Sequence, residues 1–391
     1  MDAKATTEGV PFYRHNLGEE EKRRVCEALE QPILTTGRYV AEAEAAIAKY
    51  LGIEHAVCLD SCTAALHLAL IASDIGPGDE VIVPAMTFAA TANAVLMAGA
   101  TPVFTDVDPE TGNLTVETAA AKVTRRTRAI MPVHLYGLLC DMEAFDAFAR
   151  RRGLLLIEDS AHCLEARHGA VRPGSHSRCA CLSFYATKNI TCGEGGALIT
   201  RDGDLAERAR RLALHGMTTS AYDRYGQAYK HWDIPQWGWK YNLDNIRGAL
   251  LTPQVAQLDE RWRRRMEIAR RYEAAFSEME GVEFPKVDHA ERSARHLFTI
   301  WVEPERRDEI LAHLQAQKIG VAVNYRAVHL LEYYAKTFGY RRGNLPAAER
   351  IGDRTISLPF YASLTQEQIE RVIEGVQTAV ESRQPSSSCA G

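Results

Sequence analysis

Short apolar runs rich in β-branched and aromatic residues recur along the first two-thirds of the chain. These runs predict buried β-strands at residues 80–85, 101–107, 128–135, 154–161, 181–186 and 196–200. Helical patterns lie between them, at residues 63–73, 87–99 and 142–152. Strands that alternate with helices are typical of a mostly parallel sheet with helices on both faces, so this part of the chain predicts an α/β domain.

The last third has a different pattern. An aromatic-rich segment at 217–242 predicts a long ordered loop that packs against another surface. Its aromatic residues are Tyr222, Tyr225, Tyr229, Trp232, Trp237, Trp239 and Tyr241. A long helix is predicted at 245–276, with the basic run Arg261–Arg265 on a solvated face.

A smaller α/β lobe is predicted after this helix. Its apolar runs lie at 296–303, 320–326 and 356–359, and its helices at 306–317, at 346–355 and after Thr365, which forms a capping box with Gln368. We therefore predict a large domain at 1–250, a linking helix and small C-terminal α/β domain at 251–384, and a disordered Pro/Ser-rich tail at 385–391.

Composition narrows the class of protein. The chain has 391 residues, of which 46% are hydrophobic and 25% charged, as in a folded globular protein. A net charge of −5 provides no global attraction to nucleic acid or anionic lipid. No apolar run approaches the roughly 20 residues of a membrane span, and the first 24 residues contain no apolar signal region. We expect a cytoplasmic protein that binds neither nucleic acid nor membrane.

The nine cysteines are an odd number in a chain without a signal peptide, which favours reduced thiols over a disulfide framework. The closely spaced Cys179 and Cys181 lie in a strand-like run, and their spacing is not that of a zinc knuckle. We therefore expect no bound metal.

Lys188 lies in the segment Ser183-Phe-Tyr-Ala-Thr-Lys188, between a buried strand and a glycine-rich turn, 193–196. A desolvated lysine with a lowered pKa is a nucleophile toward aldehydes and forms a Schiff base with pyridoxal 5′-phosphate (PLP). A surface lysine at a strand end would have the same local pattern. Asp159 ends an earlier buried strand and is expected at the same sheet edge, where a carboxylate could pair with the pyridine nitrogen of PLP. It could equally be the N-cap of a helix.

The segment Asp60-Ser61-Cys62-Thr63-Ala64-Ala65 precedes an apolar helical pattern. A helix N-terminus with free N–H groups and nearby hydroxyls is a seat for a phosphate, although it could also be an ordinary cap. A phosphate seat, an acid and a lysine in one chain together favour a PLP site.

The chain resembles the PLP-dependent nucleotide-sugar aminotransferases of the DegT/DnrJ/EryC1/StrS type. The resemblance runs from about residue 11 to 380 and includes the motifs LTTG, SCTAALHLAL, PAMTFAATANAV, PVFTDVDPETGNL, PVHLYG, IEDSAH, SFYATKNITCGEGG, HGM, KYNLDN and SLPFY. It implies a fold type I α/β enzyme. ITCGEGG, WKYNL and NYRAVHLLEYY look most like enzymes that aminate the 4-keto group of UDP-sugars for lipopolysaccharide, other glycans or secondary metabolites.

The resemblance also implies residue roles. Lys188 would bind PLP and later act as the base, and Asp159 would hold the pyridinium. Further cofactor contacts would come from Ser61, Cys62, Thr63, Ala64, Phe88, His162 and Ser183. Asn242 would reach the phosphate from a second subunit, which implies a homodimer with shared sites. Tyr325, Arg326 and His329 would contact the substrates, a nucleotide keto-sugar and an amino-acid donor, by resemblance L-glutamate.

Two positions depart from the family pattern, namely Cys62, where Gly or Ala is usual, and Cys192, where Thr or Ser is usual. Lys188 is intact, whereas sugar dehydratases of the family have histidine there. Two alternatives remain open at this point: a PLP-dependent lyase or decarboxylase of the same fold, and a non-catalytic sensor of PLP or a sugar nucleotide.

Overall fold

The computed structural model of the chain describes residues 9–218, 231–287 and 292–382. The expected disordered tail at 385–391 and the loop residues Tyr222, Tyr225 and Tyr229 lie outside the described residues.

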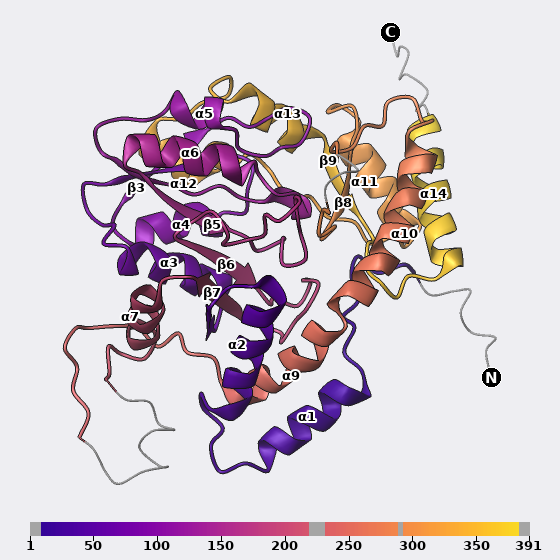
Figure 1. Cartoon of the computed structure of the whole chain (residues 1–391). Coiled ribbons are helices and arrows are strands. Elements are labelled where there is room, and N and C mark those ends of the chain that lie inside the picture. Colours follow the sequence, from indigo (N-terminus) through magenta and orange to yellow (C-terminus); the bar gives the residue numbers. More distant parts are fainter. Residues whose placement is uncertain (1–8, 219–230, 288–291, 383–391) are drawn as a thin grey trace.

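A seven-stranded sheet forms the centre of the large lobe (Figure 1). Its strand order is β1-β7-β6-β5-β4-β2-β3. The strands are β1 (His55–Leu59), β2 (Glu80–Pro84), β3 (Thr101–Thr105), β4 (Thr127–Ile130), β5 (Leu155–Asp159), β6 (Cys179–Ser183) and β7 (Gly196–Thr200). The run from β6 to β3 is parallel throughout, and β7 is antiparallel to both of its neighbours. The predicted mostly parallel α/β sheet is confirmed, with β1 as a strand that the hydrophobic pattern missed.

Helices cover both faces of this sheet. One face packs against α3 (Cys62–Ala72), α4 (Ala90–Met97) and α7 (Gly203–Ala213), and the other against α2 (Arg38–Leu51), α5 (Val116–Ala120), α6 (Met142–Arg152) and α9 (Asn245–Ala256). The strands are apolar on both sides because successive side chains point to opposite faces. In β2, for example, Val81 and Val83 join the core under α3 and α4, whereas Ile82 joins the core under α6.

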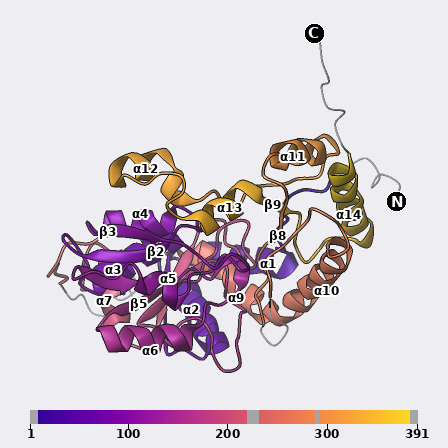
Figure 2. The ribbon, with the colours of Figure 1, turned by 90° about the horizontal axis from the view of Figure 1, so that it is seen from above.

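The smaller lobe lies beside the large one (Figure 2). Its antiparallel pair, β8 (Phe298–Trp301) and β9 (Thr355–Leu358), packs with α10 (Leu258–Phe276), α11 (Arg307–Ala316) and α14 (Gln366–Glu381). The Thr365–Gln368 capping box is present at the start of α14. Two further helices, α12 (Glu332–Phe338) and α13 (Pro346–Arg354), pack on the core of the large lobe, and α1 (Glu19–Leu29) packs against α9. Two single 3-10 turns lie at Leu135–Gly137 and Val328–Leu330. The domain boundaries stay a prediction.

The structure corrects three sequence interpretations. The expected long helix is divided at Gln257 into α9 and α10. The run at 320–326 makes a single bridge, between Ala322 and Ser357, and is not a strand. The basic run is not entirely solvated, because Arg265 is buried and forms an ion pair with the buried Glu165.

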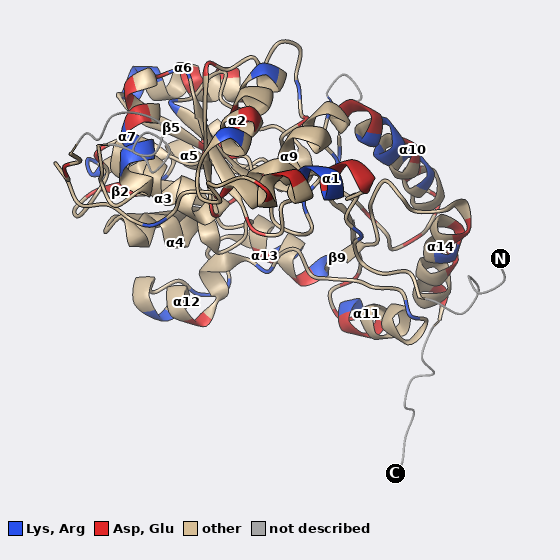
Figure 3. Cartoon of the chain, turned by 90° about the horizontal axis from the view of Figure 1, so that it is seen from below, with Lys and Arg blue, Asp and Glu red and all other residues tan. Residues whose placement is uncertain are grey.

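Charged residues of both signs are interspersed over the outer helices (Figure 3). This distribution agrees with the small net charge, −5. Within the described ranges, none of the helices combines the length and the apolar character that crossing a membrane requires.

Candidate active site

A cavity of about 500 Å³ opens at the sheet edge where the parallel strands end. The residues after β1, β2, β5 and β6 converge there because parallel strands deliver their carboxyl ends to one edge. Of the predicted site residues, the cavity lining includes Ser61, Cys62, Thr63, Phe88, Asp159, His162, Ser183, Lys188 and Tyr325. Residues separated by more than 250 positions therefore form one site, of a volume typical of small-molecule sites.

Asp159 is the last residue of β5, and its carboxyl is buried. Its Oδ2 accepts a hydrogen bond from Thr91 Oγ1 (2.7 Å), and its Oδ1 accepts one from the amide N–H of Ala161 (3.2 Å). Burial raises the pKa of the carboxyl, while these hydrogen bonds and the nearby charge of Lys188 oppose the rise. The site thus contains a desolvated carboxyl group whose ionised form a cationic ligand would stabilise.

Lys188 lies in the loop that follows β6, and it lines the cavity. Desolvation lowers the pKa of its amine to about 8, although Cys62 and Asp159 act to raise it. The Nζ atom lies 3.4 Å from Nε2 of His296. A lysine with this pKa is partly unprotonated at neutral pH, which is the form that attacks an aldehyde or accepts a proton.

The amino-terminal end of α3 forms another wall of the cavity. Ser61 is the N-cap, and its Oγ accepts a hydrogen bond from the N–H of Ala64 (3.1 Å). The N–H groups of Cys62 and Thr63, in the first turn, have no acceptor within the helix, because the first N–H groups of a helix never do. A Cβ on Gly196 would lie 2.4 Å from the N atom of Cys62, so only glycine fits beneath this turn. The result is a close-fitting seat with anion-binding character.

His162 has a defined tautomer. Its Nδ1 accepts a hydrogen bond from the backbone N–H of Tyr136 (3.3 Å), and burial together with the charge of Lys188 holds its pKa well below the usual range. A neutral ring with Nδ1 as acceptor has its proton on Nε2. Nε2 therefore donates to the hydroxyl of Tyr325, 3.2 Å away. Phe88 also lines the cavity, and the centroid of its ring lies 5.7 Å from the centroid of the Tyr325 ring.

Four predicted site residues lie outside the cavity lining. Ala64 contributes its N–H to the helix cap, and Arg326 is exposed beside Tyr325. Asn242 donates from Nδ2 to Thr36 Oγ1 (2.7 Å). His329 is buried with its Nε2 3.1 Å from Glu349 Oε1. His329 thus lies in the protein interior, outside the cavity lining, and its role as a substrate contact stays a prediction.

The side-chain partners of Asp159 and Lys188 were not predicted. Thr91, in α4, donates to Asp159 and contacts Thr87, but a threonine inside a helical pattern has no distinguishing spacing. His296 contacts Lys188 from 108 positions away, at the start of a run that was interpreted only as a strand. The proximity of each is created by the tertiary fold, so no local sequence signal could have identified it.

The donor set fits PLP. A buried carboxyl can face the pyridine nitrogen, a lysine of lowered pKa can attack the aldehyde, and the first turn of α3 can bind the phosphate. Burial also raises the pKa of the Cys62 thiol far above its usual value, so this thiol is neutral beside the seat. The departure from Gly or Ala at position 62 therefore adds no charge to the phosphate site.

The fold and site define an enzyme of the fold type I PLP-dependent class. Residues 15–377 match the model of the DegT/DnrJ/EryC1/StrS aminotransferase family, and the chain belongs to this family. The predicted resemblance is thereby confirmed. Solved structures of relatives contain PLP or its amine form, so PLP is the cofactor of this family.

Three relatives illustrate the similarity. Over 377 residues the chain is 40% identical to the spore coat polysaccharide biosynthesis protein SpsC of Bacillus subtilis, covering 95% of this chain and 97% of SpsC. The structure of S. venezuelae DesV is similar with a TM-score of 0.89 and 36% identity, covering 97% of this chain and 100% of DesV. Helicobacter pylori PseC, an aminotransferase of pseudoaminic acid biosynthesis, gives a TM-score of 0.89 and 27% identity, covering 96% and 100%. The protein is thus a PLP-dependent sugar aminotransferase of this family.

Proposed function

We propose that this protein transfers an amino group from L-glutamate to the 4-keto group of a UDP-linked sugar, in the synthesis of a lipopolysaccharide, another glycan or a secondary metabolite. The main observation that supports this proposal is the cavity that brings Lys188, Asp159 and the first turn of α3 together. The motifs ITCGEGG, WKYNL and NYRAVHLLEYY support a 4-keto-sugar acceptor by resemblance. The similarity to SpsC, a polysaccharide biosynthesis protein, supports a glycan pathway.

In this proposal Asp159 holds the protonated pyridine nitrogen, and Ser61, Cys62, Thr63, Ala64 and Ser183 hold the phosphate and the ring. When bound, PLP supplies an aldehyde that carries the amino group and a cationic ring that withdraws electrons. Lys188, with a pKa of about 8, has roughly a tenth of its amine unprotonated at pH 7. This amine takes the proton from Cα of the donor and later returns a proton to C4 of the sugar.

The remaining predicted contacts, from His162, Tyr325 and Arg326, orient the substrate in this proposal. His162 donates to the hydroxyl of Tyr325, which leaves the hydroxyl proton of Tyr325 available to a group inside the cavity. The exposed Arg326 is next to Tyr325 in sequence and is suited to bind the diphosphate of a sugar nucleotide bidentately. A negatively charged substrate would then be bound by a local cation, since the whole protein is acidic.

The acceptor is tested with the purified holoenzyme. Excess L-glutamate is expected to remove the visible absorbance of the bound cofactor, and a nucleotide-linked 4-keto-sugar is expected to restore it. The panel contains UDP, dTDP and GDP sugars with the keto group at C3 or C4. Recovery with UDP-4-keto-sugars alone supports the proposal, and recovery only with 3-keto-sugars contradicts it. Release of CO₂ from the donor would indicate a decarboxylase instead.

A cytoplasmic homodimer with shared sites is part of the proposal. Asn242 lies outside the lining of its own chain's cavity, as a residue donated to a second subunit would. Mixing a Lys188→Ala chain with an Asn242→Asp chain should regenerate one intact site in each mixed dimer. Statistical exchange then gives about a quarter of the wild-type activity from two nearly inactive proteins. If Asn242 acts within its own subunit, the mixture has no more activity than the Asn242→Asp protein alone.

A further inference from the structure

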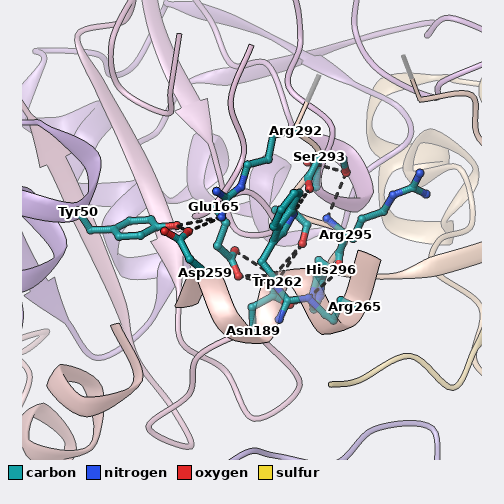
Figure 4. A network of polar contacts seen from close by, with 12 residues as sticks. Tyr50, Glu165, Asn189, Asp259, Trp262, Arg265, Arg292, Ser293, Arg295 and His296 are labelled. Carbon is teal, nitrogen blue, oxygen red and sulfur yellow. Dashed lines mark hydrogen bonds and ion pairs between the residues drawn. The ribbon is translucent and has the colours of Figure 1, made fainter. Parts of the chain in front are cut away.

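A buried polar network continues from Lys188 away from the cavity. His296 Nε2 lies 3.4 Å from Lys188 Nζ, and His296 Nδ1 lies 3.4 Å from Asn189 Oδ1. On its other side, Asn189 donates from Nδ2 to both carboxylate oxygens of Glu165 (3.2 and 3.0 Å) and to the carbonyl of Ala294 (3.2 Å). Figure 4 shows Glu165, Asn189 and His296 grouped around Arg265.

The network fixes the orientation of the Asn189 amide. Its Nδ2 faces three oxygen acceptors, so the amide nitrogen must point toward Glu165 and the amide oxygen toward His296. An amide oxygen accepts hydrogen bonds and cannot donate one. Nδ1 of His296 is therefore the protonated ring nitrogen.

The imidazole itself is neutral. Burial lowers the pKa of His296 well below its usual range, and the charges of Lys188 and Arg265 act in the same direction. A neutral ring with its proton on Nδ1 has a lone pair on Nε2. That lone pair faces the amine of Lys188, so His296 is an acceptor toward the lysine.

Arg265 fixes the position of Glu165 and of the backbone that precedes His296. It is buried in α10, forms an ion pair with Glu165 at 2.5 Å, and donates to the carbonyls of Ala294 (3.3 Å) and Arg295 (3.2 Å). These carbonyls directly precede His296 in the chain. One guanidinium thus neutralises Glu165 and anchors the backbone that carries the imidazole, which accounts for a buried arginine in a run otherwise expected at the surface.

We propose that His296 is a positioning residue for Lys188, locked by Asn189, Glu165 and Arg265 as a hydrogen-bond acceptor that holds the lysine amine whenever it is not bonded to the cofactor. The inference rests on the proposed role of Lys188. The separation of 3.4 Å is that of a long hydrogen bond, which a small movement of the flexible lysine side chain would shorten. Nε2 of His296 can accept a hydrogen bond from the lysine as an amine or as an ammonium group. It would therefore keep Nζ of Lys188 directed into the cavity between the two half-reactions.

The test measures the pKa of Lys188 directly in the full-length chain freed of cofactor. Reductive methylation with formaldehyde and cyanoborohydride is followed across pH, and labelling of the Lys188 peptide is quantified by mass spectrometry. Removing an acceptor from an ammonium group destabilises the charged form, so His296→Leu is expected to lower the pKa of Lys188 by about one unit. In His296→Gln, the amide oxygen of glutamine has a similar reach and can accept from the lysine. The pKa of Lys188 in this variant should therefore stay close to the wild-type value.

Two further variants make the outcome decisive. Asn189→Leu leaves the His296 side chain in place but frees its tautomer, and a downward shift is again expected. His67→Leu removes a buried imidazole that contacts Trp239, outside the cavity lining, and should leave the pKa of Lys188 unchanged. An unchanged or raised pKa in the His296→Leu protein, or in the Asn189→Leu protein if His296→Leu fails to fold, overturns the proposal. The measurement needs no turnover, so a wrong acceptor sugar would not affect it.

Discussion

Replacing Lys188 by alanine is expected to abolish both amino-group transfer and the visible absorbance of the bound cofactor above about 400 nm. The lysine has two roles in the proposed function: it bonds to PLP, and its amine moves the proton at Cα of the donor. General acid–base catalysis alone contributes roughly 10²–10⁴-fold, so the loss should be about a thousandfold or more. The two readings are the absorbance spectrum of the purified protein and the rate of glutamate-dependent amino transfer.

A lysine outside the cavity provides the matched control. Lys286 is exposed and forms an ion pair with Glu110, so Lys286→Ala should retain both the spectrum and the rate. Alanine at position 188 leaves the phosphate seat and Asp159 unchanged, and the variant should still bind PLP without the visible band. A Lys188→Ala protein with wild-type turnover and an unchanged band would show that another amine performs the chemistry.

Much of the large lobe could be predicted from the sequence, because its signals are local. Strands buried on both faces are continuous apolar runs, and β2, β3, β5 and β7 coincide closely with such runs. Lys188, Asp159 and the cap at Ser61 were found because strand ends and helix starts are themselves local features, and strand ends of a parallel sheet meet at one edge.

What the sequence could not provide depends on tertiary contacts. The basic run was expected to be solvated, since its charge density is visible in sequence whereas Glu165, its buried partner, lies 100 positions away. The contacts of His296 with Lys188 and of Thr91 with Asp159 join segments of comparable separation. Charges and hydroxyls at such distances give no periodic pattern, so only the folded chain reveals which of them meet.

Replacing Asp159 by asparagine is expected to leave PLP binding measurable but to slow amino transfer by roughly 10²–10³-fold, the usual cost of removing one preorganised electrostatic contact. Burial raises the pKa of this carboxyl, so its negative charge is costly unless a cation lies opposite. A protonated pyridine nitrogen is such a cation, and the pair would be mutually stabilising. An amide of the same shape keeps the cavity but does not hold the ring proton, which the electron-withdrawing role requires.

Thr91→Val separates the charge of Asp159 from its orientation. The threonine donates to Asp159 at 2.7 Å, and valine has the same shape without the hydroxyl. Losing one hydrogen bond to a buried charged group costs about 1.5 kcal/mol, so amino transfer should fall by about tenfold, far less than in Asp159→Asn. The pKa of Asp159 should also rise further, because the hydrogen bond from Thr91 lowers it.

The measurement is the rate of amino transfer by both variants with saturating L-glutamate between pH 6 and 9. The two variants should therefore differ in the shape of the pH profile as well as in the size of the loss. The higher pKa of Asp159 favours its protonated form in Thr91→Val, so this variant should lose more activity toward the acid end of the range. Asp159→Asn has no carboxyl at position 159 to titrate and should be slow throughout. Equal losses in the two variants, or an Asp159→Asn protein as fast as wild type, would contradict a role for the carboxylate charge.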